Sequence, residues 1–213
     1  IKRSELLALI ARSKRTIAVG GTSGKSTTSA MLFDILEKAG LKPSIISGAG
    51  LVSIIREGKI GNAKVGAGAW LVIEADESDG SFHKLSPEIA IITNIDSDHL
   101  DYYKTFENVQ RSFYQFALQI PFYGHLIVCG DDMVTRKLFE SFPKRCWFYG
   151  FSSDNDFYLK GEKSEYDIYQ RDKKSKAEIK IGHLSLQVPG RHNALNALAA
   201  FVASYQCGIG IDP

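Results

Sequence analysis

The sequence predicts an α/β fold, in which a mostly parallel sheet is flanked by helices and carries a small antiparallel β subdomain. As far as Phe142, short runs of β-branched and other apolar residues alternate with helix-like runs. Strands buried on both faces of a parallel sheet have this composition, because helices cover both sides. Between 145 and 188 the pattern changes to short segments in which apolar and polar residues alternate. This second pattern is typical of antiparallel strands.

The individual elements follow from the same patterns. A short amphipathic helix is predicted within 1–14, and a longer helix from 25 to 39, where apolar residues recur at helical spacing before Gly40. An alanine-rich helix is predicted from 193 to 207. The buried strands of the parallel sheet are predicted at 15–20, 43–48, 70–76, 89–95 and 125–130.

Composition and charge narrow the class of protein. The chain of 213 residues is 44% hydrophobic and 23% charged, as expected of a globular protein with a substantial core. Its net charge of +2 gives no electrostatic reason to expect nucleic acid or a membrane surface as a partner. The sequence also has no run of about 20 apolar residues, the length that a membrane helix needs. The three cysteines are widely spaced and odd in number, which favours a reducing, cytoplasmic location.

A glycine-rich turn joins the first predicted strand to the helix at 25–39. Residues 20–24, Gly-Gly-Thr-Ser-Gly, place several backbone N–H groups at the positive end of that helix, and such a group of donors suits phosphate. Lys25 can reach the β and γ phosphates of a nucleotide, and Ser26 offers a hydroxyl to Mg²⁺. The general pattern G-x-x-x-x-G-K-[ST] is not met, because Val19 stands in its first glycine position. The alternative is an ordinary strand-to-helix turn with a solvent-facing lysine.

Two further strand ends carry polar side chains, several of which can bind metal ions. They are Glu74, Asp76, Glu77 and Asp79 at the end of the run 70–76, and Asn94, Asp96, Asp98, His99 and Asp101 at the end of the run 89–95. The carboxyl ends of parallel strands meet at one edge of the sheet, where ligands of α/β proteins bind. Together with the lysine-bearing turn, the carboxylates and the imidazole predict a nucleotide–metal site. Taken singly, each acid could instead be a solvated or helix-capping loop residue, and the histidine a surface residue.

Four segments resemble, in order and spacing, the Mur ligases of bacterial peptidoglycan synthesis. They are GGTSGKSTT (20–28), EADESDGSF (74–82), TNIDSDHLDYY (93–103) and VPGRHNALNALAA (188–200). The resemblance covers nearly all of 1–213 and includes the shortened glycine loop. It implies a P-loop-type central ATP-binding domain, with a linker helix at 1–14 and the small antiparallel subdomain at about 145–190. The family's N-terminal UDP-sugar domain and C-terminal ligase domain are expected to be absent from these residues.

The resemblance implies roles for individual residues around the phosphates. Lys25 is expected to contact the β and γ phosphates of ATP. Ser26 and Glu74 are expected to bind one Mg²⁺, and His99 a second one. Lys25, Glu74 and His99 are therefore the expected catalytic residues. The residues expected to hold the nucleotide at the glycine-rich turn are Gly21, Thr22, Ser23, Gly24, Lys25, Ser26 and Thr27.

The segment after the antiparallel strands is expected to hold adenine. Asn193 and Asn196 are three residues apart, so they share one face of the predicted helix and can both contact the adenine edge. Arg191 and His192 precede this helix and are expected near the nucleotide. The alternative for Asn193 is a simple helix cap, which does not account for Asn196.

The resemblance implies ATP-dependent amide formation through an acyl phosphate, with ATP and Mg²⁺ as cofactors. It favours the type that adds L-alanine to UDP-N-acetylmuramate, because Ser78 and the sequence DHLDYY differ from the tripeptide-recycling type. No lysine lies between 105 and 119, where later-step members carry a carbamylated lysine. Ser23 departs from the histidine usual in the alanine-adding type, whereas Ser26 keeps the metal-binding hydroxyl of the usual threonine.

The expected partners are UDP-N-acetylmuramate and an amino acid. Two alternative functions remain open. One is another Mur-like ligase, of the tripeptide-recycling or the folylpolyglutamate type. The other is a nucleotide-binding regulatory ATPase that never forms an amide bond. A UDP-sugar domain and a ligase domain on either side of this chain in the full-length protein would favour a ligase.

Overall fold

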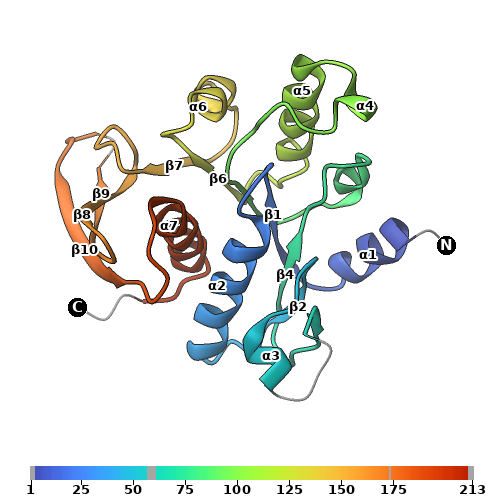
Figure 1. The fold of residues 1–213 in the computed structure, drawn as a ribbon, viewed down its shortest axis with the longest axis horizontal. Helices are drawn as coiled ribbons and strands as arrows, with labels where there is room; N and C mark the ends of the chain where they lie inside the picture. The colour runs from blue at the N-terminus through green and yellow to red at the C-terminus, as the bar shows by residue number, and fades with distance from the viewer. Residues whose placement is uncertain (1–2, 57–60, 173, 211–213) are drawn as a thin grey trace.

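A ten-stranded sheet organises residues 3–56, 61–172 and 174–210, which are the residues that the computed structural model describes (Figure 1). Its strand order is β10-β9-β8-β7-β6-β5-β1-β4-β2-β3. The strands are β1 (Arg15–Gly20), β2 (Ser44–Ile46), β3 (Ala63–Lys64), β4 (Trp70–Glu74), β5 (Ile89–Ile92), β6 (His125–Cys129), β7 (Cys146–Gly150), β8 (Phe157–Glu162), β9 (Glu165–Arg171) and β10 (Glu178–Ser185).

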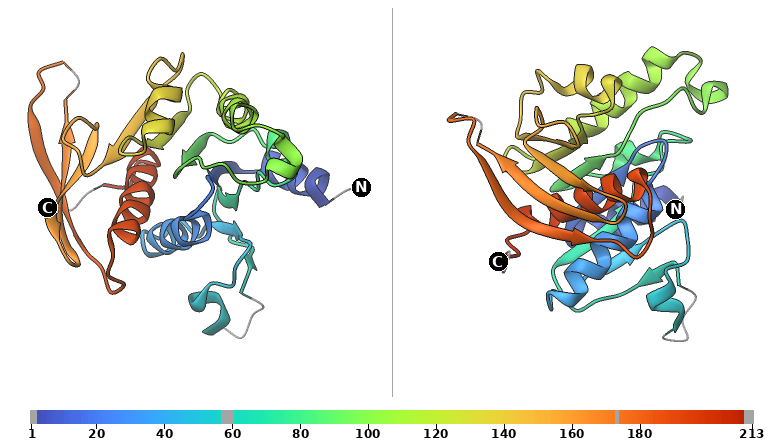
Figure 2. Two further views of the ribbon diagram at one scale, coloured as in Figure 1. Left: turned by 45° about the horizontal axis from the view of Figure 1, so that its top comes forward. Right: turned by 60° about the vertical axis from the view of Figure 1, so that its left-hand side comes forward.

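Helices cover both faces of this sheet. Helices α2 and α7 lie side by side on one face and pack against each other, while α1, α5 and α6 cover the opposite face (Figures 1 and 2). No helix in the described part of the chain has the length and the apolar character needed to cross a membrane. The helices are α1 (Arg3–Arg12), α2 (Lys25–Lys38), α3 (Val52–Arg56), α4 (Leu100–Tyr103), α5 (Phe106–Ala117), α6 (Met133–Phe139) and α7 (Arg191–Gln206), with a 3-10 turn η1 (Ser81–Lys84).

The central strands are apolar throughout because both of their faces are buried. In β1, Ile17 and Val19 belong to the core under α2 and α7, whereas Ala18 belongs to the core under α1 and α5. These three side chains have no exposed surface. Successive side chains of a strand point to opposite faces, so two covered faces require an unbroken apolar run. The prediction of a mostly parallel sheet with helices on both sides is confirmed, since β1, β2, β4, β5, β6 and β7 pair in parallel.

The antiparallel part begins later than the sequence predicted. β7 pairs in parallel with β6, with Leu126 beside Cys146, and β8 pairs in parallel with β7. At this end of the sheet the antiparallel pairs begin with β8 and β9, and these strands extend the main sheet instead of forming a sheet of their own. At the opposite edge, β3 pairs antiparallel with β2. The prediction of antiparallel pairing from residue 145 was therefore wrong for β7. The alternating sequence of β7 indicates that the strand is partly buried, but it does not indicate whether the strand pairs in parallel or antiparallel with its neighbour.

We expect the antiparallel strands to unfold together with the rest of the sheet. Phe157 of β8 is fully buried, and its ring lies 5.8 Å from that of Trp147 in β7 and 6.0 Å from that of Tyr205 in α7. Phe157→Ala should therefore lower the free energy of unfolding of the whole chain by about 3–5 kcal/mol. Urea unfolding followed by circular dichroism and by tryptophan fluorescence measures this change.

Ile179→Ala, on the exposed surface of β10, is the matched control. It should change the free energy of unfolding by less than about 0.5 kcal/mol. Two separate unfolding transitions, of which Phe157→Ala shifts only one, would contradict a single cooperative sheet.

Candidate nucleotide and metal site

Three strand ends meet at one edge of the sheet. β1 pairs in parallel with β4 on one side and with β5 on the other, and the register places Val19 beside Glu74 and Gly20 beside Ile92. The loop after β1 therefore leaves the sheet between the ends of β4 and β5. This is the arrangement that the sequence predicted for the three segments, and it follows from the common direction of the strands.

The glycine-rich turn after β1 requires glycine at two positions. Gly21 has a φ of +130°, and a Cβ atom there would stand 2.1 Å from the Thr93 hydroxyl oxygen. Gly24 has a φ of +89°, and a Cβ atom there would stand 2.6 Å from Asn196 Oδ1. Residues with side chains rarely adopt such φ angles. The turn therefore packs directly against the end of β5 through Gly21 and against α7 through Gly24.

Hydrogen bonds to the end of β5 hold this turn in place. The Ser23 N–H donates to Asn94 Oδ1 at 2.9 Å, and the Ser23 carbonyl accepts from the Thr93 hydroxyl at 2.6 Å and from the Asn94 amide at 2.9 Å. The Thr22 N–H donates to the Asn94 carbonyl at 3.0 Å. The backbone donors of Thr22 and Ser23 are thus engaged within the protein. Sequence reasoning singled out Asn94 but missed Thr93, whose signal is a hydroxyl residue directly after the apolar run of β5.

Helix α2 begins with backbone donors that have no partner within the helix. Gly24 is its N-cap, and the Thr28 N–H makes the first helical bond, to the Gly24 carbonyl at 2.9 Å. The N–H groups of Lys25, Ser26 and Thr27 come before that bond. With the positive end of the helix dipole, they form a place where an anion can bind.

The Lys25 ammonium curls back over the turn and is fully engaged by protein groups. Its Nζ donates to the Gly21 carbonyl at 2.6 Å, to the Thr22 carbonyl at 3.3 Å and to Glu77 Oε1 at 2.8 Å. An ammonium has three N–H donors. A phosphate can therefore take a hydrogen bond from Lys25 only in place of one of these acceptors.

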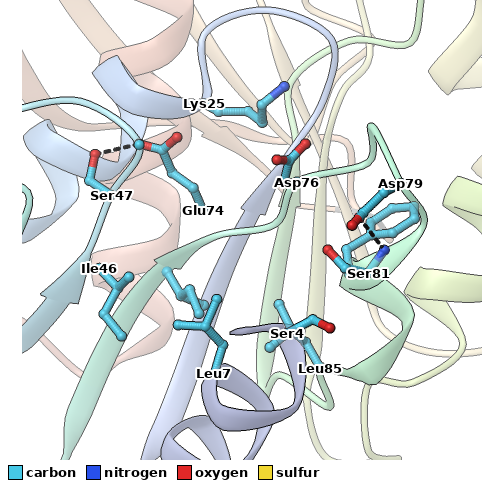
Figure 3. A pocket seen from close by; sticks show the side chains of 13 residues that line it. Ser4, Leu7, Lys25, Ile46, Ser47, Glu74, Asp76, Asp79, Ser81 and Leu85 are labelled. Carbon is cyan, nitrogen blue, oxygen red and sulfur yellow. Dashed lines mark hydrogen bonds between the residues drawn. The ribbon is translucent and has the colours of Figure 1, made fainter. Parts of the chain in front are cut away.

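Two hydroxyl groups orient the Glu74 carboxylate. The Ser26 hydroxyl donates to Oε2 at 3.1 Å, and the Ser47 hydroxyl donates to Oε1 at 2.5 Å; Figure 3 shows the second contact. Ser47 follows β2 and was missed by sequence reasoning, since its only signal is a serine at the end of a predicted buried strand.

The chemistry of these donors fits Mg²⁺. The ion prefers hard oxygen ligands and is commonly held by one or two carboxylates together with substrate phosphates and water. Ser26 and Glu74 supply a hydroxyl and a carboxylate beside the anion-binding start of α2. In the residues that the structure describes, no group of three or more His, Cys, Asp or Glu side chains forms a metal centre by itself.

A cavity of about 370 Å³ opens beside Glu74 and Lys25. In Figure 3 its polar end is lined by Lys25, Glu74 and Asp76, and its apolar end by Leu7 of α1 and by Leu85. The cavity thus connects the predicted phosphate and metal ligands to the surface beside α1.

Glu77 and His99 form a second group at Lys25. Glu77 is only 3% exposed, and its Oε1 lies 2.8 Å from Lys25 Nζ and 4.0 Å from His99 Nε2. His99 Nε2 also lies 3.8 Å from Asp98 Oδ2. His99 is the residue before α4, and its backbone φ of 55° is in the left-handed region. The side chain of His99 thus lies beside Glu77 and Asp98.

Burial separates the four acids at the end of β4. Glu77 is buried and Glu74 partly buried, whereas Asp76 and Asp79 are exposed. Asp79 accepts from the Ser81 N–H at 2.8 Å where η1 begins, and hydrogen bonds from the side chain and backbone of Ser81 lower the pKa of the Asp79 carboxyl. Asp76 accepts a backbone bond within its own loop. Asp76 and Asp79 therefore behave as solvated or capping loop residues, the alternative that the sequence left open for each acid.

Helix α7 brings Asn196 to the glycine-rich turn. The helix starts at Arg191, before the predicted residue 193, and Gly190 is its N-cap. Asn193 therefore lies within the first turn and is not the cap; its Nδ2 donates to the Pro189 carbonyl at 3.0 Å. Asn196 lies three residues further along, next to Gly24.

Arg191 reaches the ends of β6 and β7. Its guanidinium carbon lies 3.7 Å from the centre of the Phe151 ring, and its Nη2 lies 3.9 Å from Asp131 Oδ2. The Asp131 carboxylate in turn accepts from the N–H groups of Phe151 and Ser152. His192 is exposed. The closeness of Arg191 and His192 to a nucleotide stays a prediction.

Comparison of the sequence with known proteins identifies one family. The Mur ligase middle domain matches residues 19–204. The UDP-N-acetylmuramate–L-alanine ligase of Bdellovibrio bacteriovorus is 56% identical over 209 residues, a match that covers 98% of this chain and 45% of that protein. The chain therefore spans less than half the length of this relative.

Solved structures of similar fold point to the same family. A UDP-N-acetylmuramate–alanine ligase from Thermotoga maritima has a TM-score of 0.78 and 26% identity, over 97% of this chain and 45% of that one. A UDP-N-acetylmuramate:L-alanyl-γ-D-glutamyl-meso-diaminopimelate ligase from Neisseria meningitides has a TM-score of 0.83 over 100% of this chain and 68% of that one. Its 23% identity shows the fold alone. Since the family match spans most of the chain and the fold agrees with it, this chain belongs to the Mur ligase family.

Proposed function

We propose that the full-length protein is an ATP-dependent ligase of peptidoglycan precursor synthesis that joins L-alanine to UDP-N-acetylmuramate. The observation that carries the proposal is the convergence of Lys25, Ser26 and Glu74 at one sheet edge, in a chain 56% identical to a ligase of that name. This chain is then the ATP-binding domain, and a UDP-sugar domain and a ligase domain flank it. The odd number of cysteines supports a cytoplasmic location.

The start of α2 holds the phosphates in this proposal. The N–H groups of Lys25, Ser26 and Thr27 donate to phosphate oxygens, and the Lys25 ammonium contacts the β and γ phosphates. The residues Gly21, Thr22, Ser23 and Gly24 shape the cradle, through the two glycine conformations and the bonds to the end of β5.

Mg²⁺ is proposed to bind between Ser26, Glu74 and the phosphates. The hydroxyl and the carboxylate are already 3.1 Å apart, and Ser47 holds the other carboxylate oxygen. Bound there, the ion neutralises phosphate charge that develops during transfer. His99 is proposed as a ligand of a second ion, because its ring is partly exposed beside Glu77, which in turn contacts Lys25. Lys25, Glu74 and His99 are the proposed catalytic residues.

Asn193 and Asn196 are proposed to contact adenine. They share one face of α7, and Asn196 stands against Gly24 of the phosphate-binding turn. A base attached to phosphates at the start of α2 can therefore reach this face. The amide groups can both donate to and accept from the adenine edge.

The chemistry that fits the site is amide formation in two steps. A carboxylate oxygen of UDP-N-acetylmuramate attacks the γ-phosphorus of ATP, and the bond to ADP breaks, leaving an acyl phosphate. The alanine nitrogen then attacks the acyl carbon, phosphate leaves and the nitrogen loses a proton. Lys25 and the α2 dipole position the phosphates and offset their charge. The cavity beside Glu74 gives the substrate carboxylate a path to the γ-phosphate.

The full-length protein should release phosphate from ATP when UDP-N-acetylmuramate and L-alanine are both present. A coupled phosphate assay that compares L-alanine, glycine, L-serine and the tripeptide as acceptors checks this. We expect the highest kcat/KM with L-alanine. A preference for the tripeptide would identify a recycling ligase instead, and ATP hydrolysis without any amide product would identify a regulatory ATPase.

Glu74→Ala should reduce ligation far more than it reduces stability. A carboxylate that holds Mg²⁺ contributes to turnover and little to core packing, so we expect kcat/KM to fall at least about 100-fold. The melting temperature should change by only a few degrees, as roughly expected for a loss of about 1 kcal/mol. Glu88→Ala, which removes a partner of Arg15 on another part of the surface, is the control and should keep full activity. Unchanged ligation in Glu74→Ala would exclude the metal role.

Replacing both Asn193 and Asn196 by alanine should weaken ATP binding by roughly 10- to 100-fold, because two hydrogen bonds to the base are lost. Affinity for inorganic triphosphate should stay the same, since it has no base. Calorimetric titration of both ligands measures the difference. An equal loss for the two ligands would show that the asparagines do not recognise adenine.

A further inference from the structure

Glu77 carries a buried carboxylate that is only half satisfied. Its backbone carbonyl accepts from the Tyr103 hydroxyl at 2.5 Å and from the Gly80 N–H at 3.1 Å, which fixes the position of the residue. Its Oε1 accepts from Lys25, whereas its Oε2 is buried without a hydrogen-bond partner. A buried carboxylate depends on a paired cation. Lys25 supplies that pairing.

The same lysine is the one proposed to bind phosphate. All three donors of Lys25 already have protein acceptors, and of these only Glu77 is charged. When Lys25 turns to a phosphate, the Glu77 charge loses its partner and faces an anionic nucleotide. Like charges in a partly buried site repel strongly. A divalent ion that arrives with the nucleotide can offset this charge, and His99, the proposed ligand of such an ion, lies 4.0 Å from Glu77 Oε1.

We propose that Glu77 is a positioning residue that makes nucleotide binding depend on Mg²⁺. Glu77 holds Lys25 on the glycine-rich turn, and it yields the lysine readily only when a divalent ion offsets its own charge. A nucleotide that carries no Mg²⁺ leaves Glu77 without compensation beside the phosphates and binds weakly. This inference rests on the proposed function, because it requires the phosphates at the start of α2. Glu74 and Ser26 hold the ion, and Glu77 makes its presence necessary.

The test is Glu77→Gln in the full-length protein. Glutamine keeps the shape of the side chain and an acceptor for Lys25, and it removes only the charge. The affinity for a non-hydrolysable ATP analogue is measured by calorimetry, once with excess Mg²⁺ and once with EDTA. We expect the ratio of the two dissociation constants, EDTA over Mg²⁺, to fall at least about fivefold in the variant, a typical size for coupling between two ligands. The fall should come mainly from tighter binding in EDTA.

Two further variants separate charge from structure. Glu37→Gln removes an equivalent pair near the other end of α2, where Glu37 Oε1 accepts from Lys64 at 2.8 Å and Oε2 is likewise buried without a partner. Its ratio should equal that of the wild type. Glu77→Asp keeps the charge, and its ratio should stay closer to the wild type than to Glu77→Gln.

An unchanged ratio in Glu77→Gln would overturn the inference, and so would an equal fall in Glu37→Gln or in Glu77→Asp. In these cases the wild type still binds the nucleotide with Mg²⁺, and the proposed function stands. If the wild type binds no nucleotide even with Mg²⁺, the proposed function fails and the role of Glu77 fails with it.

Discussion

Parallel pairing of β1 with both β4 and β5 is the constraint on which the candidate site depends. It brings the ends of three strands to one edge, so residues that are about 50 and 70 positions apart in the chain meet around the glycine-rich turn. Because both faces of these strands are buried, a shift of register by one residue would exchange the two apolar faces. The packing of the core therefore also sets the geometry of the polar edge.

Hydrogen bonds and an ion pair fix the side chains and the turn that the strands bring together. Thr93 and Asn94 bind the carbonyl of Ser23 and so fix the turn, which leaves the first N–H groups of α2 directed away from the protein backbone. Lys25 then lies between its own turn and Glu77. This ion pair offsets the charge of Glu77. The two serines that contact Glu74 hold its carboxylate in one orientation.

The second half of the sheet contributes to the site through α7. Strands β8 to β10 continue the sheet past β7 and curve beside α7, as the right-hand view of Figure 2 shows. The chain then returns to pack α7 against α2, on the same face of the sheet. In this way Asn196, which is 172 residues after Gly24, lies directly against the phosphate-binding turn. The antiparallel strands thus form part of the core that positions α7.

The sequence by itself determined the central strands, the start of α2 and the shared edge of the three strand ends, because apolar periodicity and glycine positions are local consequences of burial and backbone freedom. Only the tertiary structure decided that β7 runs parallel to β6, since an alternating pattern records burial and not the partner strand. It also decided which acid is buried. Glu74 and Glu77 look equivalent in the sequence, yet one accepts from two serines and the other pairs with Lys25. Ser47 and Thr93 show in the sequence only as hydroxyl residues at the ends of apolar runs, because their roles arise from neighbours that only folding brings within hydrogen-bonding distance.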